Sequence, residues 1–381
     1  MSATAPTVVV GGGIGGITAA LALIRTGRQV VVLERCPTPV DTGSGITLSR
    51  NAMAGLDAIG VGDEVRAVGS QPPPGSGGFR TPRGEVLVDA HAAVQDLYAF
   101  HRADLHRVLR GLLPDETIRT DHDVQRVSTT SLGACVEIAH RQTIQAELVV
   151  AADGWRSRIR SASHPEYSGP RYAGYTTWRA VTTSRVELGG IAGESWGSGE
   201  RFGILPLRDG LVYWFAVATL PPGNHDAGLN EVHRRFATWH RPIPELLEAT
   251  DPATVIHLDI YDLPLPLPPF TAGNVVLLGD AAHAMTPDIG QGAGQAIEDA
   301  VVLAAELART PSQAAALKRY DTARRPRTEQ VSKTAHRTGQ MAQAQGRLAV
   351  PLRNAMMRLT PPSISTKMLE RITAWTPPAT P

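Results

Sequence analysis

Cysteine and lysine are both scarce in this chain of 381 residues, which has two cysteines and only Lys318, Lys333 and Lys367 as lysines. Two cysteines, Cys36 and Cys135, are too few for a disulfide framework or a cysteine-ligated zinc site, so we expect a reducing, cytoplasmic environment. Acidic and basic residues nearly balance at a formal net charge of +1, and this balance gives no electrostatic reason to expect a nucleic-acid partner.

Long apolar runs are also missing. No segment approaches the roughly 20 consecutive apolar residues that a membrane-spanning helix requires. The first apolar stretch, Thr7 to Val10, has no basic segment before it, so we expect no signal peptide. The length allows one large domain or two closely packed ones, with a sizeable core.

A glycine-rich turn follows the first apolar stretch directly. Thr7 to Val10 is typical of a buried strand, Gly11-Gly12-Gly13-Ile14-Gly15-Gly16 comes next, and apolar residues from Ile17 to Ile24 then recur at helical spacing. A second strand, Val30 to Leu33, ends in Glu34. This order predicts a βαβ unit that binds a dinucleotide.

Three glycines of that turn each have a physical task. Gly11 permits the tight turn, Gly13 lets the backbone approach a pyrophosphate, and Gly16 allows the helix to pack closely on the strand. The helix N-terminus presents free N–H groups to the phosphates. Glu34 is placed to accept hydrogen bonds from the ribose hydroxyls, and the alternative for the whole motif is a plain glycine turn.

Two further strands end in carboxylates. Leu148 to Ala152 runs into Asp153-Gly154, and Val275 to Leu278 runs into Gly279-Asp280. Such carboxylates can bind sugar or ribityl hydroxyls at the edge of a parallel sheet, although an ordinary helix cap is the alternative for either one alone. Gly290 to Gly294 opens a long helix whose N–H groups favour negative charge, as on a reduced flavin, unless these glycines serve only close packing. Two distant glycine turns predict a long ligand with two ends to hold, FAD rather than NAD.

The residue pattern in the middle of the chain predicts mostly β-strands. They are expected at 176–183, 202–207, 211–218 and 257–260, before the prolines of 264–269. We therefore predict an α/β fold in which a Rossmann-like FAD-binding domain is interrupted by a β-sheet-rich substrate domain and followed by a helical C-terminal tail. The expected boundaries are residues 1–70, 98–168 and 270–345 for the FAD-binding domain, 71–97 and 169–269 for the substrate domain, and 346–381 for the tail.

Three motifs together resemble the fingerprints of class A flavoprotein monooxygenases, the aromatic hydroxylases of the 4-hydroxybenzoate hydroxylase fold. They are Gly11 to Gly16 with Glu34, then Ala152-Asp153-Gly154-x-x-Ser157-x-x-Arg160, and then Gly279-Asp280-Ala281-Ala282-His283 with Pro287. The similarity covers roughly residues 5 to 340. It implies that FAD is reduced by NADH or NADPH, which binds without a domain of its own, and that O2 then forms a flavin C4a-hydroperoxide. This hydroperoxide would hydroxylate a planar aromatic or N-heteroaromatic small molecule.

The resemblance also implies site residues. The residue matching Pro287 packs near the isoalloxazine in that family, and the Arg matching Arg102 contacts FAD. The expected cofactor-binding residues are Gly11, Gly13, Ile14, Gly15, Gly16, Glu34, Arg35, Arg102, Asp153, Asp280, Pro287, Gly290, Gly292, Ala293 and Gly294.

The segment Tyr172-Ala173-Gly174-Tyr175-Thr176-Thr177-Trp178-Arg179 is similar to a small single-component branch that includes urate hydroxylase and 3-hydroxybenzoate 6-hydroxylase. Arg201, Tyr213 and Asp288 match the spacing of urate hydroxylase's substrate-side residues, and Asp288 could equally be a loop residue bonded to backbone. The expected catalytic or substrate-orienting residues are Arg179, Arg201, Tyr213, Trp214 and Asp288. At least one aromatic of Tyr213, Trp214 and Phe215 must be core, because side chains alternate between the faces of a strand.

The hairpin between the strands at 202–207 and 211–218 leaves its register open. A two-residue Asp209-Gly210 turn would put Arg201 and Tyr213 on opposite faces, whereas a three-residue Arg208-Asp209-Gly210 loop would put them on the same face.

Alternatives remain for the function and for the tail. The rival functions are a flavin-dependent epoxidase, a halogenase, which the absence of any Trp-x-Trp pair disfavours, a non-catalytic flavin-binding protein, and an NAD dehydrogenase that uses only the first βαβ unit. His101, His257 and His283 are expected to be structural, and no spacing predicts a metal site. Apolar residues between Leu348 and Leu359 predict a tail helix that covers the core or a dimer contact, or else touches a membrane or an apolar substrate. The chain is expected to be a monomer or a homodimer.

Overall fold

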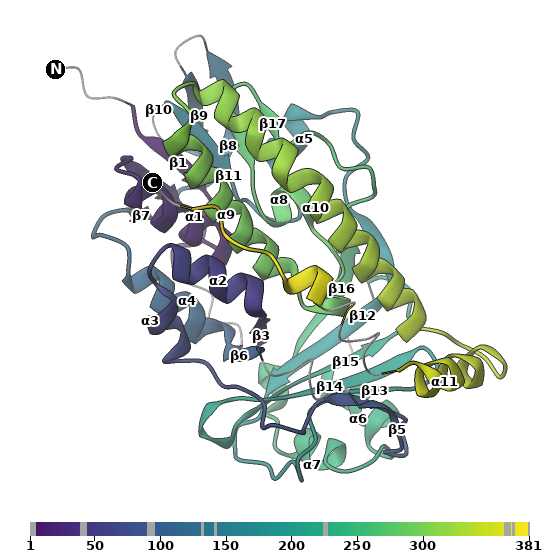
Figure 1. The fold of residues 1–381 in the computed structure, drawn as a ribbon. Coiled ribbons are helices and arrows are strands. Elements are labelled where there is room, and N and C mark those ends of the chain that lie inside the picture. The colour runs from purple at the N-terminus through teal and green to yellow at the C-terminus, as the bar shows by residue number, and fades with distance from the viewer. Residues whose placement is uncertain are drawn as a thin grey trace.

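The computed structural model describes residues 5–38, 44–89, 96–130, 133–140, 143–223, 228–361, 367 and 370–379. One half of the molecule is built on a six-stranded sheet with the order β17-β18-β11-β1-β2-β7 (Figure 1). These strands are β1 (Thr7–Val10), β2 (Val30–Leu33), β7 (Ile118–Arg119), β11 (Leu148–Ala151), β17 (Thr271–Ala272) and β18 (Val275–Leu277). All the pairs except β17 with β18 are parallel, so strands from distant parts of the chain end at one edge.

Two helices cover this sheet and contact each other. α1 (Ile14–Arg25) follows β1, and α9 (Gly292–Arg309) follows β18 after a short segment. Their buried apolar residues, Ile17 and Leu21 of α1 and Ile297 and Val301 of α9, belong to the same hydrophobic core as the strands. The core therefore fixes the start of α9 beside the start of α1.

A seven-stranded sheet forms the other half, with the order β16-β12-β15-β14-β13-β4-β5. Its strands are β4 (Gly78–Arg80), β5 (Val86–Asp89), β12 (Arg171–Val181), β13 (Gly193–Trp196), β14 (Glu200–Pro206), β15 (Val212–Ala218) and β16 (Ile256–Asp262). One face of this sheet packs on α6 (Gly228–Phe236) and α7 (Ile243–Glu248) through a second apolar core. The other face is turned toward the six-stranded half (Figure 1).

The predicted strands and fold class are confirmed, and the hairpin register is now fixed. Leu207 donates from its backbone N–H to the Leu211 carbonyl, and the ladder pairs Leu205 with Tyr213, so the loop is the three-residue Arg208-Asp209-Gly210. Arg201 and Tyr213 consequently lie on the same face. The residue boundaries between domains stay a prediction.

Several elements had no sequence assignment. They are β3 (Gly45–Leu48), β6 (Tyr98–His101), α2 (Arg50–Ala58), α3 (Gly62–Arg66), α5 (Arg158–Ser163), α8 (Asp280–His283), α10 (Gln313–Ala342) and the three-stranded sheet of β8 (Val124–Thr130), β9 (Gly133–Ile138) and β10 (Ile144–Ala146). Helix α4 (Arg102–Gly111) begins at Arg102, the arginine expected to contact FAD. Helix α10 runs from the six-stranded half to the seven-stranded half (Figure 1).

The tail helix is α11 (Ala349–Leu359), and it covers the core with only one face. Arg353 and Met357 are buried there, and Arg353 donates to backbone carbonyls of Trp196 and Ala342. The apolar residues of the predicted stripe lie on the exposed side instead, since Leu348 and Leu359 are each more than four-fifths exposed. Of the helices in the described ranges, none is both long and apolar enough to cross a bilayer.

Candidate active site

The first glycine turn is held by backbone contacts that exclude side chains. Gly11 has a φ of +107°, and a Cβ added to it would lie 2.3 Å from the carbonyl oxygen of Ala152. A Cβ on Gly16 would lie 2.0 Å from the Gly11 carbonyl oxygen. Gly13 differs, because no other atom lies within 4 Å of an added Cβ there. The turn is thus packed behind Gly11 and Gly16 and open in front of Gly13.

The second glycine turn meets the first at one residue of α9. A Cβ on Gly279, which has a φ of +62°, would lie 3.1 Å from the Ala296 side chain. A Cβ on Gly15 would lie at the same distance of 3.1 Å from that side chain. Turns that are about 265 positions apart in the sequence therefore lie side by side because α9 offers only an alanine between them.

One continuous cavity of about 1010 Å³ joins both turns to the seven-stranded sheet. Gly13 to Gly16 line one part of it, and Asp280, Pro287, Gly290, Gly292 and Ala293 line another. The volume is at the upper end of small-molecule pockets, as expected for a site that takes a cofactor and a second small molecule. Open space in front of Gly13 and Gly292, two helix N-termini and one cavity that both turns line fit the two halves of FAD.

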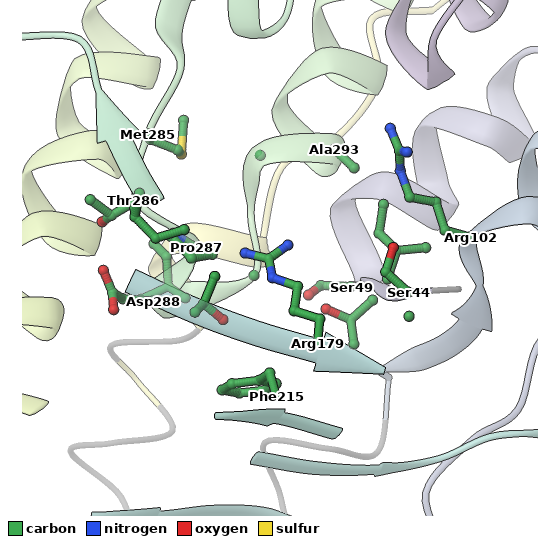
Figure 2. A pocket seen from close by; sticks show the side chains of 18 of the residues that line it. Ser44, Ser49, Arg102, Arg179, Phe215, Met285, Thr286, Pro287, Asp288 and Ala293 are labelled. Atoms are coloured by element: carbon green, nitrogen blue, oxygen red, sulfur yellow. The ribbon is translucent and has the colours of Figure 1, made fainter. Parts of the chain in front are cut away.

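Arginines approach the middle of the cavity from two sides. Figure 2 shows Arg179 reaching from β12 toward Pro287 and Ala293, with Arg102 on one side and the Met285–Asp288 segment on the other. Burial lowers the pKa of the Arg102 guanidinium, and the carboxylate of Asp280 acts in the opposite direction. Arg102 and Arg179 both line the cavity, so their positive charges can favour negative charge on a ligand bound between the glycine turns and the sheet.

A buried ion cluster closes the far end of the cavity. The Arg201 guanidinium donates to the carboxylates of Asp288 and Glu194, and the Tyr175 hydroxyl donates to Asp288 Oδ2 over 2.7 Å. Arg201 is 1 % exposed, and its two acids surround it. Asp288 is therefore not a loop residue bonded to backbone. It is the buried counter-ion of Arg201.

Comparison with known proteins agrees with this geometry. The family described as "FAD binding domain" matches residues 4–335. The chain belongs to the FAD-binding family of flavoprotein monooxygenases. It is 38% identical to the aurachin C monooxygenase/isomerase of Stigmatella aurantiaca over 92% of this chain and 93% of that protein. It is 31% identical to an FAD-dependent urate hydroxylase of Klebsiella pneumoniae over 83% of this chain and 85% of that one.

A solved structure shows the same fold with its ligands bound. Klebsiella pneumoniae HpxO complexed with FAD and uric acid superposes with a TM-score of 0.90, at 26% identity, over 98% of both chains. The prediction that this flavoprotein monooxygenase takes FAD is thereby confirmed. The roles of its individual residues stay predictions.

Ten of the predicted cofactor residues border the cavity, and five do not. The lining includes Gly13, Ile14, Gly15, Gly16, Arg102, Asp280, Pro287, Gly290, Gly292 and Ala293. Gly11 lies behind the turn, Gly294 packs near Asn51 of α2, and Arg35 is exposed. Glu34 accepts hydrogen bonds from the backbone N–H groups of Gly12 and Cys36, so its carboxylate shapes the turn, and its contact with ribose is still a prediction.

The contacts of Asp153 match the second of its two expected roles, that of a helix cap. Its carboxylate accepts a hydrogen bond from Ile159 N–H at the start of α5, and burial raises its pKa. Ser157 caps the same helix, and the buried Arg160 donates to the carbonyls of Trp155 and Ala281. Arg160 of this fingerprint therefore connects α5 to the segment that contains Asp280. Gly154 and Trp155, the two residues after Asp153, line the cavity.

The expectation that Trp214 orients a substrate is wrong. Trp214 is fully buried on the face of β15 that packs on α6 and α7, where it stacks on Phe202 and donates to Thr250 Oγ1. Its neighbours Tyr213 and Phe215 face the cavity, because adjacent strand residues point to opposite faces. Trp214 is the core aromatic of the three.

Three residues of the site were missed from the sequence. Glu194 lines the cavity beside Arg201, Tyr175 holds Asp288, and Ala296 sits between the glycine turns. Tyr175 lies within the segment that resembles the small branch, which was a usable signal. Glu194 had none, because nothing in Gly193-Glu194-Ser195-Trp196 shows which strand it pairs with.

Proposed function

We propose that this flavoprotein monooxygenase uses NAD(P)H and O2 to hydroxylate a planar aromatic or N-heteroaromatic small molecule, with the ring held between the cofactor and the seven-stranded sheet. The observation that supports this is the single cavity that runs from both glycine turns to the polar face bearing Arg179, Arg201 and Tyr213. Urate, an N-heteroaromatic compound, is what the Klebsiella relative hydroxylates by its name, and uric acid is bound in the superposed structure.

FAD, when bound, supplies the redox chemistry that activates O2. The chain's own residues bind, orient and exclude water. The N-terminus of α1 and the open face of Gly13 would hold the pyrophosphate, and Asp280 would accept hydrogen bonds from the ribityl hydroxyls. Arg102 and the N-terminus of α9 would favour negative charge on the reduced ring system.

At the substrate end, we assign orientation to Arg179, Tyr213 and the Arg201–Asp288 pair. Burial raises the pKa of Tyr213, so its phenol stays protonated at neutral pH and can donate a hydrogen bond. Because Arg201 is already paired with carboxylates, its fixed position can orient a ring without a change in its own charge.

The test uses the purified protein as isolated with its flavin. We expect FAD to be released on heating, and O2 uptake with NADH or NADPH to rise when a suitable phenol or hydroxylated heteroaromatic compound is added. A flavin that neither nicotinamide nucleotide reduces would contradict the proposal and favour a non-catalytic flavin-binding protein.

A further inference from the structure

Four residues paired across four strands of the seven-stranded sheet form a row, and three of them, Arg179, Phe215 and Glu194, line the cavity. The ladders pair Arg179 of β12 with Phe215 of β15, Phe215 with Gly203 of β14, and Gly203 with Glu194 of β13. Directly paired residues share a face of the sheet. The row therefore presents a cation, an aromatic ring, a glycine without a side chain and an anion in that order. The outer two backbones are about 14 Å apart, since neighbouring strands lie about 4.8 Å apart.

The centre of the row is a flat apolar floor. A Cβ on Gly203 would lie 2.1 Å from Cζ of Phe215, so the ring extends across the glycine. Phe215 itself lines the cavity, whereas Gly203 lies beneath its ring. An aromatic face of this kind is suited to offset stacking of a planar ligand.

The anionic end has a free acceptor. Glu194 Oε2 accepts hydrogen bonds from Trp196 Nε1 over 2.9 Å and from Arg201 Nη1 over 3.4 Å. Within the described part of the chain, no hydrogen bond reaches the other oxygen, Oε1, and the side chain is 18% exposed to the cavity it lines. The carboxylates of Glu194 and Asp288 outnumber the one guanidinium between them, so this end disfavours a further negative charge.

The cationic end complements it. Arg179 lines the cavity, and among the described residues no carboxylate forms an ion pair with it. Figure 2 shows its guanidinium directed into the cavity, away from the strand on which Phe215 lies. Its charge is available to an acceptor oxygen on a ligand.

From this row we infer that the substrate is a neutral heteroaromatic ring system that stacks on Phe215, directs an N–H or O–H donor to Glu194 and turns an acceptor oxygen toward Arg179. The inference rests on the proposed function and narrows it. It makes Glu194 a specificity-determining residue, because an aromatic carboxylate at that end would meet two carboxylates.

The test compares two probes that differ by one hydrogen-bond donor. 4-Quinolone carries an N–H and a carbonyl at opposite ends of one ring, and 1-methyl-4-quinolone lacks the N–H. Binding to the FAD-loaded protein is measured from the perturbation of the flavin absorption spectrum, which does not depend on turnover. We expect the N–H probe to bind about 10-fold more tightly, as a hydrogen bond to a charged group would give.

The variant Glu194→Gln should reduce this preference to about threefold or less, since a neutral acceptor forms a weaker hydrogen bond. Glu200→Gln is the matched control, because Glu200 lies on the adjacent strand and is bound to Arg235 outside the cavity. It should keep the full preference. Arg179→Gln should weaken both probes equally.

The outcomes separate the two proposals. Equal affinities of the two probes for the unmodified protein, or an undiminished preference in Glu194→Gln, would overturn the role of Glu194 while leaving a working monooxygenase. If no aromatic compound of any kind perturbs the flavin or stimulates O2 uptake, the proposed function fails with it.

Discussion

Gly11 and Gly13 stand two residues apart in the same turn and should respond in opposite ways to a methyl group. Gly11→Ala places a Cβ against the Ala152 carbonyl at a φ of +107°, so we expect it to lower the free energy of unfolding by at least about 2 kcal/mol, measured by urea denaturation of the FAD-free protein. Gly13→Ala is the matched control, since its Cβ meets nothing within 4 Å. It should keep that stability and lose FAD affinity instead. Equal destabilisation by both changes would contradict this account of the turn.

Acidification should weaken the N–H probe through Glu194. Burial raises the pKa of this carboxyl, the Arg201 guanidinium opposes the shift, and Asp288 reinforces it. A raised pKa means that Glu194 takes up a proton at a higher pH than an ordinary glutamate, and the protonated acid is a poorer acceptor. The affinity for 4-quinolone should therefore fall as the pH is lowered from about 8 to about 5, a range above the usual glutamate pKa.

The same titration on Glu194→Gln should be flat, and so should that of 1-methyl-4-quinolone on the unmodified protein. A pH response that is identical for both probes would assign the titration to another group.

At the scale of single residues, motif positions were predictable and cross-strand partners were not. Gly11 and Gly16 were identified because local spacing specifies their tasks, whereas Pro287 was assigned through the family resemblance of its motif. Trp214 was misassigned because an aromatic run does not state which of its members faces the core. Glu194 and Arg201 are adjacent only through the ladder of β13 and β14, which no local pattern encodes.

Helices α9 and α10 are joined by a buried ion network. Its removal should lower the free energy of unfolding of the protein. Arg324 of α10 donates to Asp299 over 2.6 Å and also to Glu298, while His283 contacts Asp299 over 2.6 Å. Arg324→Met leaves Asp299 with His283 and Glu298 with Arg327 as remaining partners, so we expect a loss of about 3 kcal/mol in the free energy of unfolding, the lower end for a broken buried ion pair. The structural role expected for His283 is consistent with these contacts.

Arg325→Met provides the control for that measurement by urea denaturation. Arg325 is the next residue of α10, and its ion pair with Asp321 is partly exposed. Its loss should change the stability by about 1 kcal/mol or less. Comparable losses for the two variants would show that the buried network adds nothing specific to the α9–α10 contact.

At the scale of elements, the strands with strong apolar patterns were predicted to within a few residues, whereas α10 was not assigned. Its polar sequence contains Pro326 and has little apolar periodicity, and its buried positions are set by contacts with α9 and with the Pro287–Ile289 turn. The hairpin of β14 and β15 was recognised, but its register depended on one residue of loop length that both alternatives allowed.

FAD should stabilise the whole molecule by linking its two glycine turns. Added to the FAD-free protein at 100 times its dissociation constant, FAD should raise the free energy of unfolding by about 2.7 kcal/mol. FMN lacks the adenylate half that the turn of Gly11 to Gly16 would hold, so at the same concentration it should stabilise far less. Equal stabilisation by FMN and FAD would contradict a site that grips both halves.

At the scale of the molecule, the expectation that two distant turns converge was correct because both follow strands of one parallel sheet. The way the tail packs was not predictable, since its helix buries Arg353 and exposes Leu348 and Leu359. An apolar stripe at helical spacing indicates a helix without stating whether that stripe or an arginine stem meets the core.

The alternation along β14 and β15 has a practical consequence for protein engineering. Leu205, Phe215 and Val217 line the cavity, whereas their immediate neighbours Ile204, Trp214 and Ala216 fill the core against α6 and α7. A directed-evolution library confined to Leu205, Phe215 and Val217 can diversify the ring systems accepted by the enzyme without disturbing the scaffold that supports them. Arg201 and Gly203 share that face but stay fixed, because Arg201 pairs with buried Asp288 and a Cβ on Gly203 would lie 2.1 Å from the Phe215 ring.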